Sequence, residues 1–177
     1  QLEGLAYKLV PIKTPADATG INMGQVNSKL MYQNVMENFK WGNMERPDVY
    51  IDENNGRMMM NIRNTFNRLA ETLVAEGQNE KATKVLDRGV ELIPHKVVPY
   101  NYFSMMMAET YFKAGKPEKG KEIISTIMTD YEEQLDYFFK LTVTDFELDT
   151  SNWTEDERRD VLEYRWWKLS ELIESNG

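Results

Sequence analysis

The sequence is defined first by what it lacks. None of its 177 residues is a cysteine, which excludes disulfides and thiolate metal sites. It has one histidine and a net charge of −8 at pH 7, which argues against a nucleic-acid-binding face. No apolar run approaches the roughly 20 residues that a membrane-spanning helix needs, so we expect no direct membrane insertion by this chain. We also expect no cofactor and no metal site.

Two helical-hairpin repeats occupy the middle of the chain. Each has a small residue in its first helix, another twelve positions later, and a glycine at the turn between them, which is the tetratricopeptide pattern. The first repeat (56–94) is marked by Phe66, Leu69, Ala70, Leu73, Gly77, Ala82, Leu86 and Pro94. The second (99–132) is marked by Met107, Ala108, Tyr111, Gly115, Gly120, Ile124 and Ile127. The sequence therefore predicts two stacked hairpins.

The spacing between the repeats is longer than usual. Ala70 and Ala108 lie 38 positions apart, about four more than the 34 of a strict repeat. This difference predicts a lengthened loop over 95–99. Gly120 stands where the repeat usually has alanine, which costs some helix propensity.

The N-terminal segment (1–55) is expected to be partly extended and to contain one helix. Residues 1–12 alternate as a strand would, with Leu5, Tyr7 and Leu9 on one side. Helical spacing follows over 27–41, where Met31, Val35 and Phe39 recur every four residues. Asn27 or Ser28 is a candidate cap for this helix, and Asp52 is a candidate cap for the first repeat helix.

The C-terminal residues 133–177 are interpreted as a degenerate capping hairpin. Its last helix would carry an apolar stripe and begin with a capping box at Thr154 and Glu157. The chain is short enough to form one domain over 1–177. The predicted fold class is therefore all-α: a short tetratricopeptide-like hairpin stack with a partly extended N-terminal segment.

The residues that could carry chemistry have structural interpretations, which we favour. His95 has no carboxylate or second histidine at motif spacing, so we interpret it as a solvent-facing loop residue. The methionine runs 58–60 and 105–107 are interpreted as core and groove lining, because consecutive helix residues point in different directions. The tryptophans are interpreted as anchors of the capping helix, with stacking on sugars as the alternative: Trp153, Trp166 and Trp167.

The best candidate for a binding surface is the groove lined by the first helices of the two repeats. Repeat register assigns to it Asn64, Asn67, Glu71, Tyr102, Met105, Glu109 and Phe112. The lysines and asparagines that would clamp a partner's terminal carboxylate are missing at the matching positions. A polar and aromatic groove for a peptide, a helix or a glycan end fits better. The other interpretation is that this groove packs against the rest of a parent protein.

Three stretches resemble one family of proteins. They begin at Gly4, Trp41 and Val85 and read GLAYKLVPI, WGNMERPDVYIDENN and VLDRGVELIP. They are similar to the C-terminal region of large bacterial polytopic membrane proteins of unknown function. The N-terminal part of those proteins resembles protein O-mannosyltransferases. The resemblance implies that this chain is a fragment of a longer polypeptide, as does its start at Gln1 in the middle of an apolar pattern.

The expected function follows from the repeats and this resemblance together. We expect a non-catalytic interaction or docking module, with a protein or peptide as partner, including the membrane part of the same polypeptide. The alternative is a glycan- or acceptor-binding module that contributes to glycosyl transfer. The fragment is not expected to be an enzyme. The resemblance implies tethering through upstream membrane segments. We expect the module on the periplasmic side, although the sequence of this chain leaves the side of the membrane open.

Overall fold

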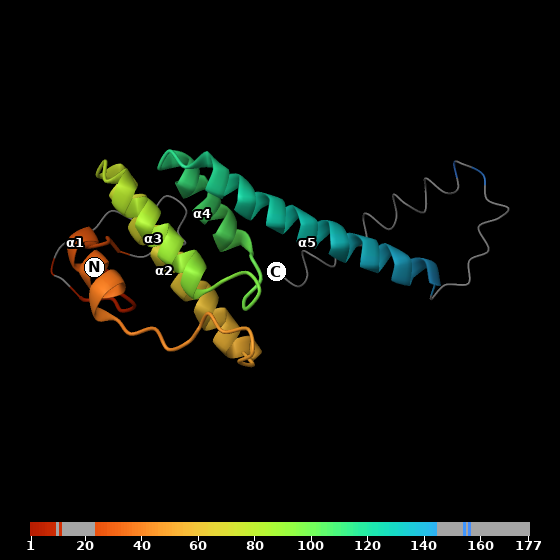
Figure 1. The fold of residues 1–177 in the computed structure, drawn as a ribbon, viewed down its shortest axis with the longest axis horizontal. Coiled ribbons are helices and arrows are strands. Elements are labelled where there is room, and N and C mark those ends of the chain that lie inside the picture. Colours follow the sequence, from red (N-terminus) through yellow and green to blue (C-terminus); the bar gives the residue numbers. More distant parts are fainter. Residues whose placement is uncertain (10, 12–23, 145–153, 155, 157–177) are drawn as a thin grey trace. The chain divides into compact units, whose positions relative to one another are not determined.

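The computed structural model describes residues 1–9, 11, 24–144, 154 and 156. The chain divides into two compact units, Gln1–Tyr131 and Glu132–Gly177. The predicted all-α class is confirmed, since the described residues contain no strand and form only two isolated bridges. The helices, shown in Figure 1, are α1 (Ser28–Gln33), the π-helix η1 (Asn34–Asn38), α2 (Glu53–Ala75), α3 (Asn79–Leu92), α4 (Tyr102–Lys113) and α5 (Pro117–Thr144). No helix within these residues is long and apolar enough to cross a membrane.

Local sequence signals set the ends of the repeat helices. The Asp52 side chain accepts a hydrogen bond from the Asn55 amide at 2.9 Å and caps α2, as predicted. Gly77 and Gly115 close the two hairpins with φ of +75° and +78°, a region that side chains other than glycine rarely adopt. Pro117 is the first residue of α5, where its missing amide hydrogen breaks no helical bond.

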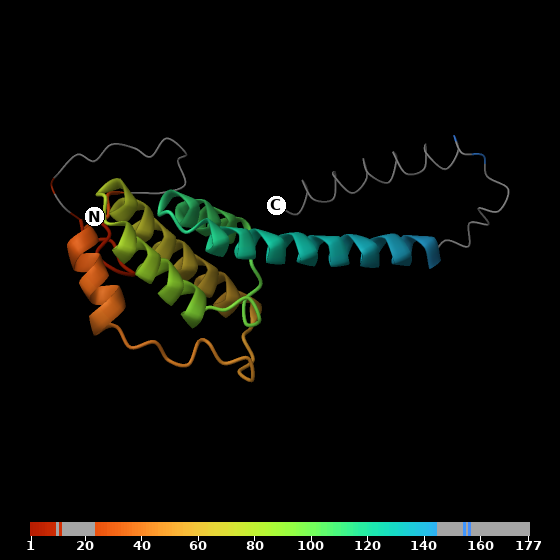
Figure 2. The ribbon, with the colours of Figure 1, turned by 45° about the horizontal axis from the view of Figure 1, so that its top comes forward.

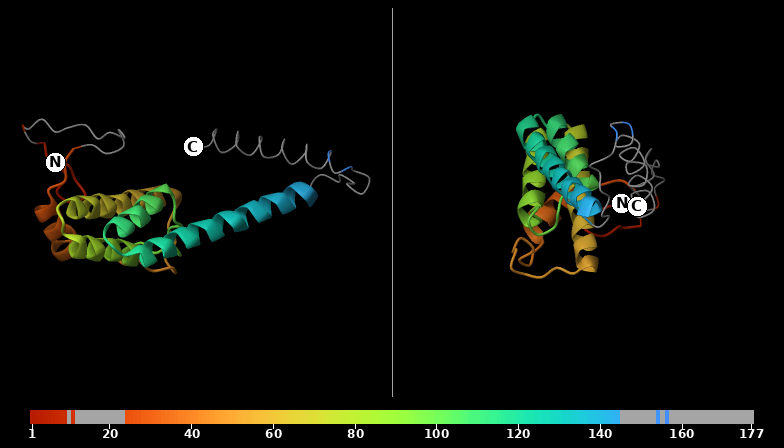
Figure 3. Two further views of the ribbon diagram at one scale, coloured as in Figure 1. Left: turned by 90° about the horizontal axis from the view of Figure 1, so that it is seen from above. Right: turned by 90° about the vertical axis from the view of Figure 1, so that its right-hand side faces the viewer.

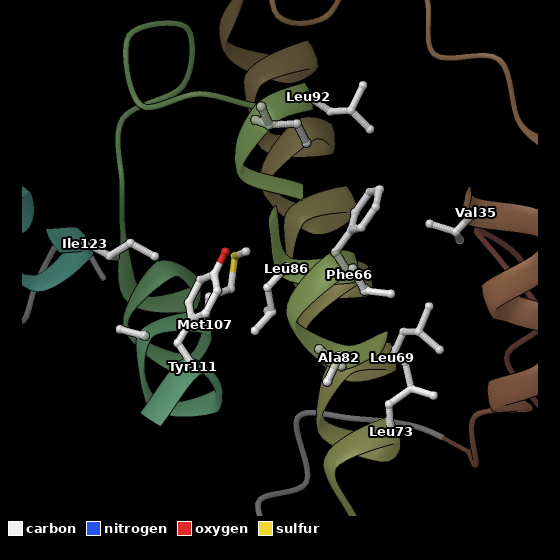
Figure 4. Packing of buried hydrophobic residues seen from close by; sticks show 14 of the residues in the cluster. Val35, Phe66, Leu69, Leu73, Ala82, Leu86, Leu92, Met107, Tyr111 and Ile123 are labelled. Carbon is white, nitrogen blue, oxygen red and sulfur yellow. The ribbon is translucent and has the colours of Figure 1, made fainter. Parts of the chain in front are cut away.

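The core lies around the first hairpin. Phe66, Leu69 and Leu86 are fully buried at its centre. Figure 4 shows Val35 on one side of this group and Met107 and Tyr111 on the other. Figure 2 shows the same order at the level of elements, with α1 and η1 on one side of α2 and α3, and α4 on the opposite side. Figure 3 gives two further views of this arrangement. The first hairpin is therefore covered on both of its stacking faces.

The strand-like prediction for residues 1–12 is wrong for the described part of that segment. The Leu2 side chain is buried, whereas Leu5, Tyr7 and Leu9 are exposed. Gln1 and Lys8 exchange hydrogen bonds at 2.8 and 2.7 Å, and the chain bends between them. The alternating pattern did not produce a strand because only one side chain of this turn reaches the core.

The helix predicted over 27–41 is shorter than expected. Asn27 caps α1 by accepting a hydrogen bond from the Leu30 amide at 3.2 Å. The last turn widens into η1, and Phe39 has an extended backbone with ψ of 138°. Met31 and Val35 are buried, but Phe39 leaves the helix before it could continue their stripe. The wider π turn changes the helical register, which a regular period of 3.6 residues cannot anticipate.

The predicted capping hairpin over 133–177 lies mostly outside the described residues, as do the three tryptophans assigned to it. The expectation of a single domain over 1–177 stays a prediction. Within the described part, α5 passes the predicted boundary at 132 and 133 without interruption.

Gly120 is required by packing at the crossing of α4 and α5. A β-carbon there would lie 2.8 Å from the Phe112 ring and 2.9 Å from the Ala108 carbonyl oxygen. Alanine gains up to about 1 kcal/mol in helix propensity, but overpacking costs about 1–3 kcal/mol. We therefore expect Gly120→Ala to lower the free energy of unfolding by about 1–2 kcal/mol in urea titrations.

The matched control for this prediction is Gly56→Ala. Gly56 lies in α2, and a β-carbon there would meet nothing within 4 Å. The same substitution should therefore stabilise the protein by about 0.5–1 kcal/mol. Equal effects at the two glycines would contradict the packing explanation for Gly120.

Candidate functional site

The structure divides the seven predicted groove residues into a buried group and an exposed group. Asn67, from α2, is fully buried. Its Oδ1 accepts a hydrogen bond from the Thr110 hydroxyl at 2.8 Å, and its Nδ2 donates to Glu71 at 3.1 Å. Asn67 therefore joins α2 to α4, and its side chain is not available to a partner.

Asn64 and Glu71 are also partly withdrawn from solvent. The Asn64 Oδ1 is buried and finds no hydrogen-bond partner among the described residues. Burial raises the pKa of the Glu71 carboxyl, and the hydrogen bond from Asn67 opposes that shift. The α2 side of the predicted groove is thus a polar contact zone between helices.

This raised pKa predicts how the stability contribution of Glu71 changes with pH. A carboxyl whose pKa is higher in the folded state favours folding below the unfolded pKa, and this contribution is lost as pH rises through the folded pKa. We expect Glu71→Gln to be more stable than wild type at pH 7, and the difference to shrink as pH falls through that window. Urea titrations of both proteins across this pH range measure the effect. A glutamine variant less stable at pH 7 would contradict it.

The α4 side of the predicted groove is exposed and mostly apolar. Tyr102, Met105 and Phe112 all present their side chains to solvent. Glu109, on the same stripe, forms an ion pair with Lys113 at 2.8 Å. These residues belong to a larger surface, which a comparison of the two repeats identifies.

Equivalent positions of the two repeats, 38 residues apart, differ sharply in exposure. Leu86 is fully buried, whereas its equivalent Ile124 is 38% exposed. Ile93 is fully buried, whereas its equivalent Tyr131 is 51% exposed. The second hairpin covers these positions of the first, but within residues 24–131 no further hairpin covers the second. We call the resulting surface the open face: Tyr102, Met105, Phe112, Ile124, Met128 and Tyr131.

The two helices of the open face are held in a defined register. The position of a β-carbon on Gly120 is close to both Ala108 and Phe112, so the middle of α4 lies against the first turn of α5. Because the two helices run antiparallel, Met105 then lies at about the level of Ile124. The open face is thus one surface shared by α4 and α5.

His95 is interpreted from the sequence as a solvent-facing loop residue, and it does lie in the loop after α3, but its side chain is half-buried. Its side chain is only 28% exposed, and its Nε2 lies 3.4 Å from the Asp130 carboxylate on α5. Its Nδ1 accepts a hydrogen bond from the Tyr100 amide at 3.1 Å. Both ring nitrogens are therefore engaged, which leaves neither to act as a general base. The carboxylate partner was missed because it lies 35 residues away and is brought near only by the fold.

His95 lines a cleft of about 540 Å³ between α3, the loop after it and α5. At its base, the Tyr111 hydroxyl donates a hydrogen bond to Asp87 at 2.9 Å, and Lys119 binds the same carboxylate oxygen at 2.5 Å. Burial raises the pKa of Tyr111, and the hydrogen bond to Asp87 raises it further. The phenol therefore stays protonated at neutral pH, and these groups mainly join α3 to α4 and α5.

Arg63 is a structurally important core residue that no sequence pattern singled out. It is fully buried, yet no carboxylate within the described part of the chain pairs with it. Its guanidinium instead donates to the carbonyl oxygens of Ile93, Val98 and Pro99, at 2.9, 2.7 and 3.2 Å. This buried arginine therefore helps to hold the lengthened loop that the repeat spacing predicted, together with the contacts of His95.

The described residues contain no group of three or more histidine, aspartate and glutamate side chains that could hold a metal ion. Comparison of the chain with known protein families, curated proteins and solved structures found no match.

Proposed function

We propose that this chain is a non-catalytic protein-interaction module, and that the open face is its docking surface. The observation that carries the proposal is the difference between equivalent positions of the two repeats. Leu86 and Ile93 are covered by the next hairpin, whereas Ile124 and Tyr131 keep apolar side chains in solvent. Contiguous exposed apolar side chains on a folded domain mark sites of protein association.

The chemistry of the cleft supports an interaction role over a catalytic one. A general base needs a free nitrogen or oxygen within reach of its substrate. His95 uses both nitrogens to hold the loop, and Asp87 already binds Tyr111 and Lys119. The polar groups of the cleft therefore serve to join helices. The exposed apolar surface of α4 and α5 is the better candidate for a functional site.

We further propose that the module belongs to a larger membrane glycosyltransferase-like protein, tethered through upstream segments and facing the periplasm. This part rests on the resemblance of the stretches that begin at Gly4 and Trp41. Its test is the full-length reading frame. Apolar segments of about 20 residues upstream of Gln1 would support it, together with an excess of lysine and arginine in the flanking loops that remain in the cytoplasm. An upstream sequence without such segments would contradict it.

The docking proposal is tested in the full-length polypeptide. The double variant Met105→Glu/Ile124→Glu places two charges on the open face. It should reduce both the size of the purified complex and the activity of the full-length protein. Met58→Glu is the matched control, since Met58 is an exposed methionine on α2, outside this face. Deletion of residues 1–177 should have the same effect as the double substitution. Full activity and unchanged complex size in both would contradict the proposal.

A further inference from the structure

We infer that the open face binds a second copy of this chain, in a symmetric dimer that joins α4 and α5 of one copy to α4 and α5 of the other. This inference rests on the proposed docking function and names its partner. Three observations carry it: the area of the face, the charge around it and the state of the opposite end of the stack.

The area is sufficient for a specific dimer. The six side chains of the open face are 38–58% exposed. With roughly 200 Å² for a side chain of this size, they present on the order of 600 Å² per chain. Two copies would bury about 1,200 Å² in total, the lower end of the range for specific interfaces. We therefore expect reversible association, with a dissociation constant on the order of micromolar.

The charge around the face suits self-association. The whole chain carries a net charge of −8, which would oppose contact between most parts of two copies. Beside the open face, however, two acids are matched by bases: Glu109 pairs with Lys113 at 2.8 Å, and Glu118 pairs with Lys121 at 3.4 Å. Each pair is neutral as a whole, so these parts of the rim do not repel a second copy. They can also exchange partners across a two-fold axis, where an acid of one copy meets a base of the other.

The opposite end of the stack prevents head-to-tail growth. Met31 and Val35 of α1 and η1 are buried against the first hairpin there. The Trp41 ring packs on Phe66 with centroids 5.4 Å apart, and the Lys81 ammonium of α3 lies 5.6 Å from the Tyr32 ring. A second copy therefore cannot stack as a following repeat on this covered end. Association of two open faces with each other gives a closed dimer, whereas a filament would need the covered end as its second contact.

The experiment measures the mass of purified chain 1–177 by sedimentation equilibrium and light scattering, from about 1 to 200 µM. We expect a monomer–dimer equilibrium. Met105→Glu and Ile124→Glu should each weaken it at least about tenfold, because each places two like charges in one apolar interface. Met58→Glu should leave it unchanged, and circular dichroism should show that all three variants remain folded.

A second measurement uses the absence of cysteine from the natural chain. Single cysteines introduced at Met105, Ile124 or Met128 should form disulfide-linked dimers under mild oxidation at one or more positions. A cysteine at Lys84, exposed on α3 and outside the open face, should not. A mass that stays monomeric up to the highest concentration would overturn the inference, as would a dimer insensitive to both glutamate substitutions. If chain 1–177 is monomeric but the full-length complex still depends on Met105 and Ile124, the docking proposal stands and only its partner is wrong.

Discussion

Replacing Arg63 with alanine should lower the free energy of unfolding by about 3–5 kcal/mol, among the largest effects of any single substitution in this chain. The guanidinium donates to the carbonyl oxygens of Ile93, Val98 and Pro99, and to the Ser104 hydroxyl, which lies 3.3 Å away. Alanine would leave the buried carbonyl oxygens of Ile93 and Val98 without this donor and open a cavity beneath the loop. Burial lowers the pKa of Arg63 to about 10, so the side chain is still charged at neutral pH.

Urea or thermal denaturation at pH 7 measures this effect, and two further variants sharpen it. Arg57→Ala removes an arginine that pairs with Glu53 on the surface of α2, and should change stability by less than about 1 kcal/mol. Arg63→Met keeps much of the volume but none of the donors. A loss close to that of alanine would assign the effect to hydrogen bonds, and a much smaller loss would assign it to packing. Equal, small effects for Arg63→Ala and Arg57→Ala would show that the loop does not depend on this residue.

The losses of stability caused by Leu86→Ala and Ile124→Ala should differ by about 1–4 kcal/mol, although the two positions are equivalent in the repeats. Leu86 is fully buried between the hairpins, so its truncation leaves a cavity and should cost about 2–5 kcal/mol. Ile124 is 38% exposed, and its truncation in the monomer should cost about 1 kcal/mol. The comparison holds residue volume and helix position nearly constant.

The two variants must be compared below the concentration at which the chain would dimerise. Under that condition, similar losses at Leu86 and Ile124 would mean that the open face is covered within the monomer, and would remove the basis of the docking proposal. At high concentration the loss at Ile124 should grow if a second copy covers it. Fluorescence-detected urea titrations at about 1 and 100 µM would measure both conditions.

Short-range patterns predicted the repeat hairpins well, because their determinants lie within a few residues of each other. Asp52, Gly77, Gly115 and Pro117 act at the positions expected of them, since capping, left-handed turns and the first helical turn depend on local backbone chemistry. The same local rules failed for residues 1–9. There the alternating pattern resembles a strand, but strand formation needs a neighbouring strand, and the described residues contain none.

The candidate site could be predicted only in part, because burial depends on which elements meet. Asn67 and Met105 are equivalent positions and both were assigned to a groove. Asn67 is buried against Thr110 and Met105 is exposed, because in the part of the chain that the structure describes only the first repeat has a hairpin stacked on that side. The role of Arg63 depends on partners 30 to 41 residues away along the chain. The role of His95 depends on Asp130, which is 35 residues away.

The sequence by itself determined the helical class, the turns and the length of the loop between the hairpins, since these follow from local propensity and periodicity. The tertiary structure alone decided which equivalent residues are covered, what holds the lengthened loop, and that a side chain at Gly120 would crowd Phe112 and Ala108. These properties arise from contacts between helices. A linear pattern specifies which residues can face a neighbour, but only the assembled fold specifies whether a neighbour is there.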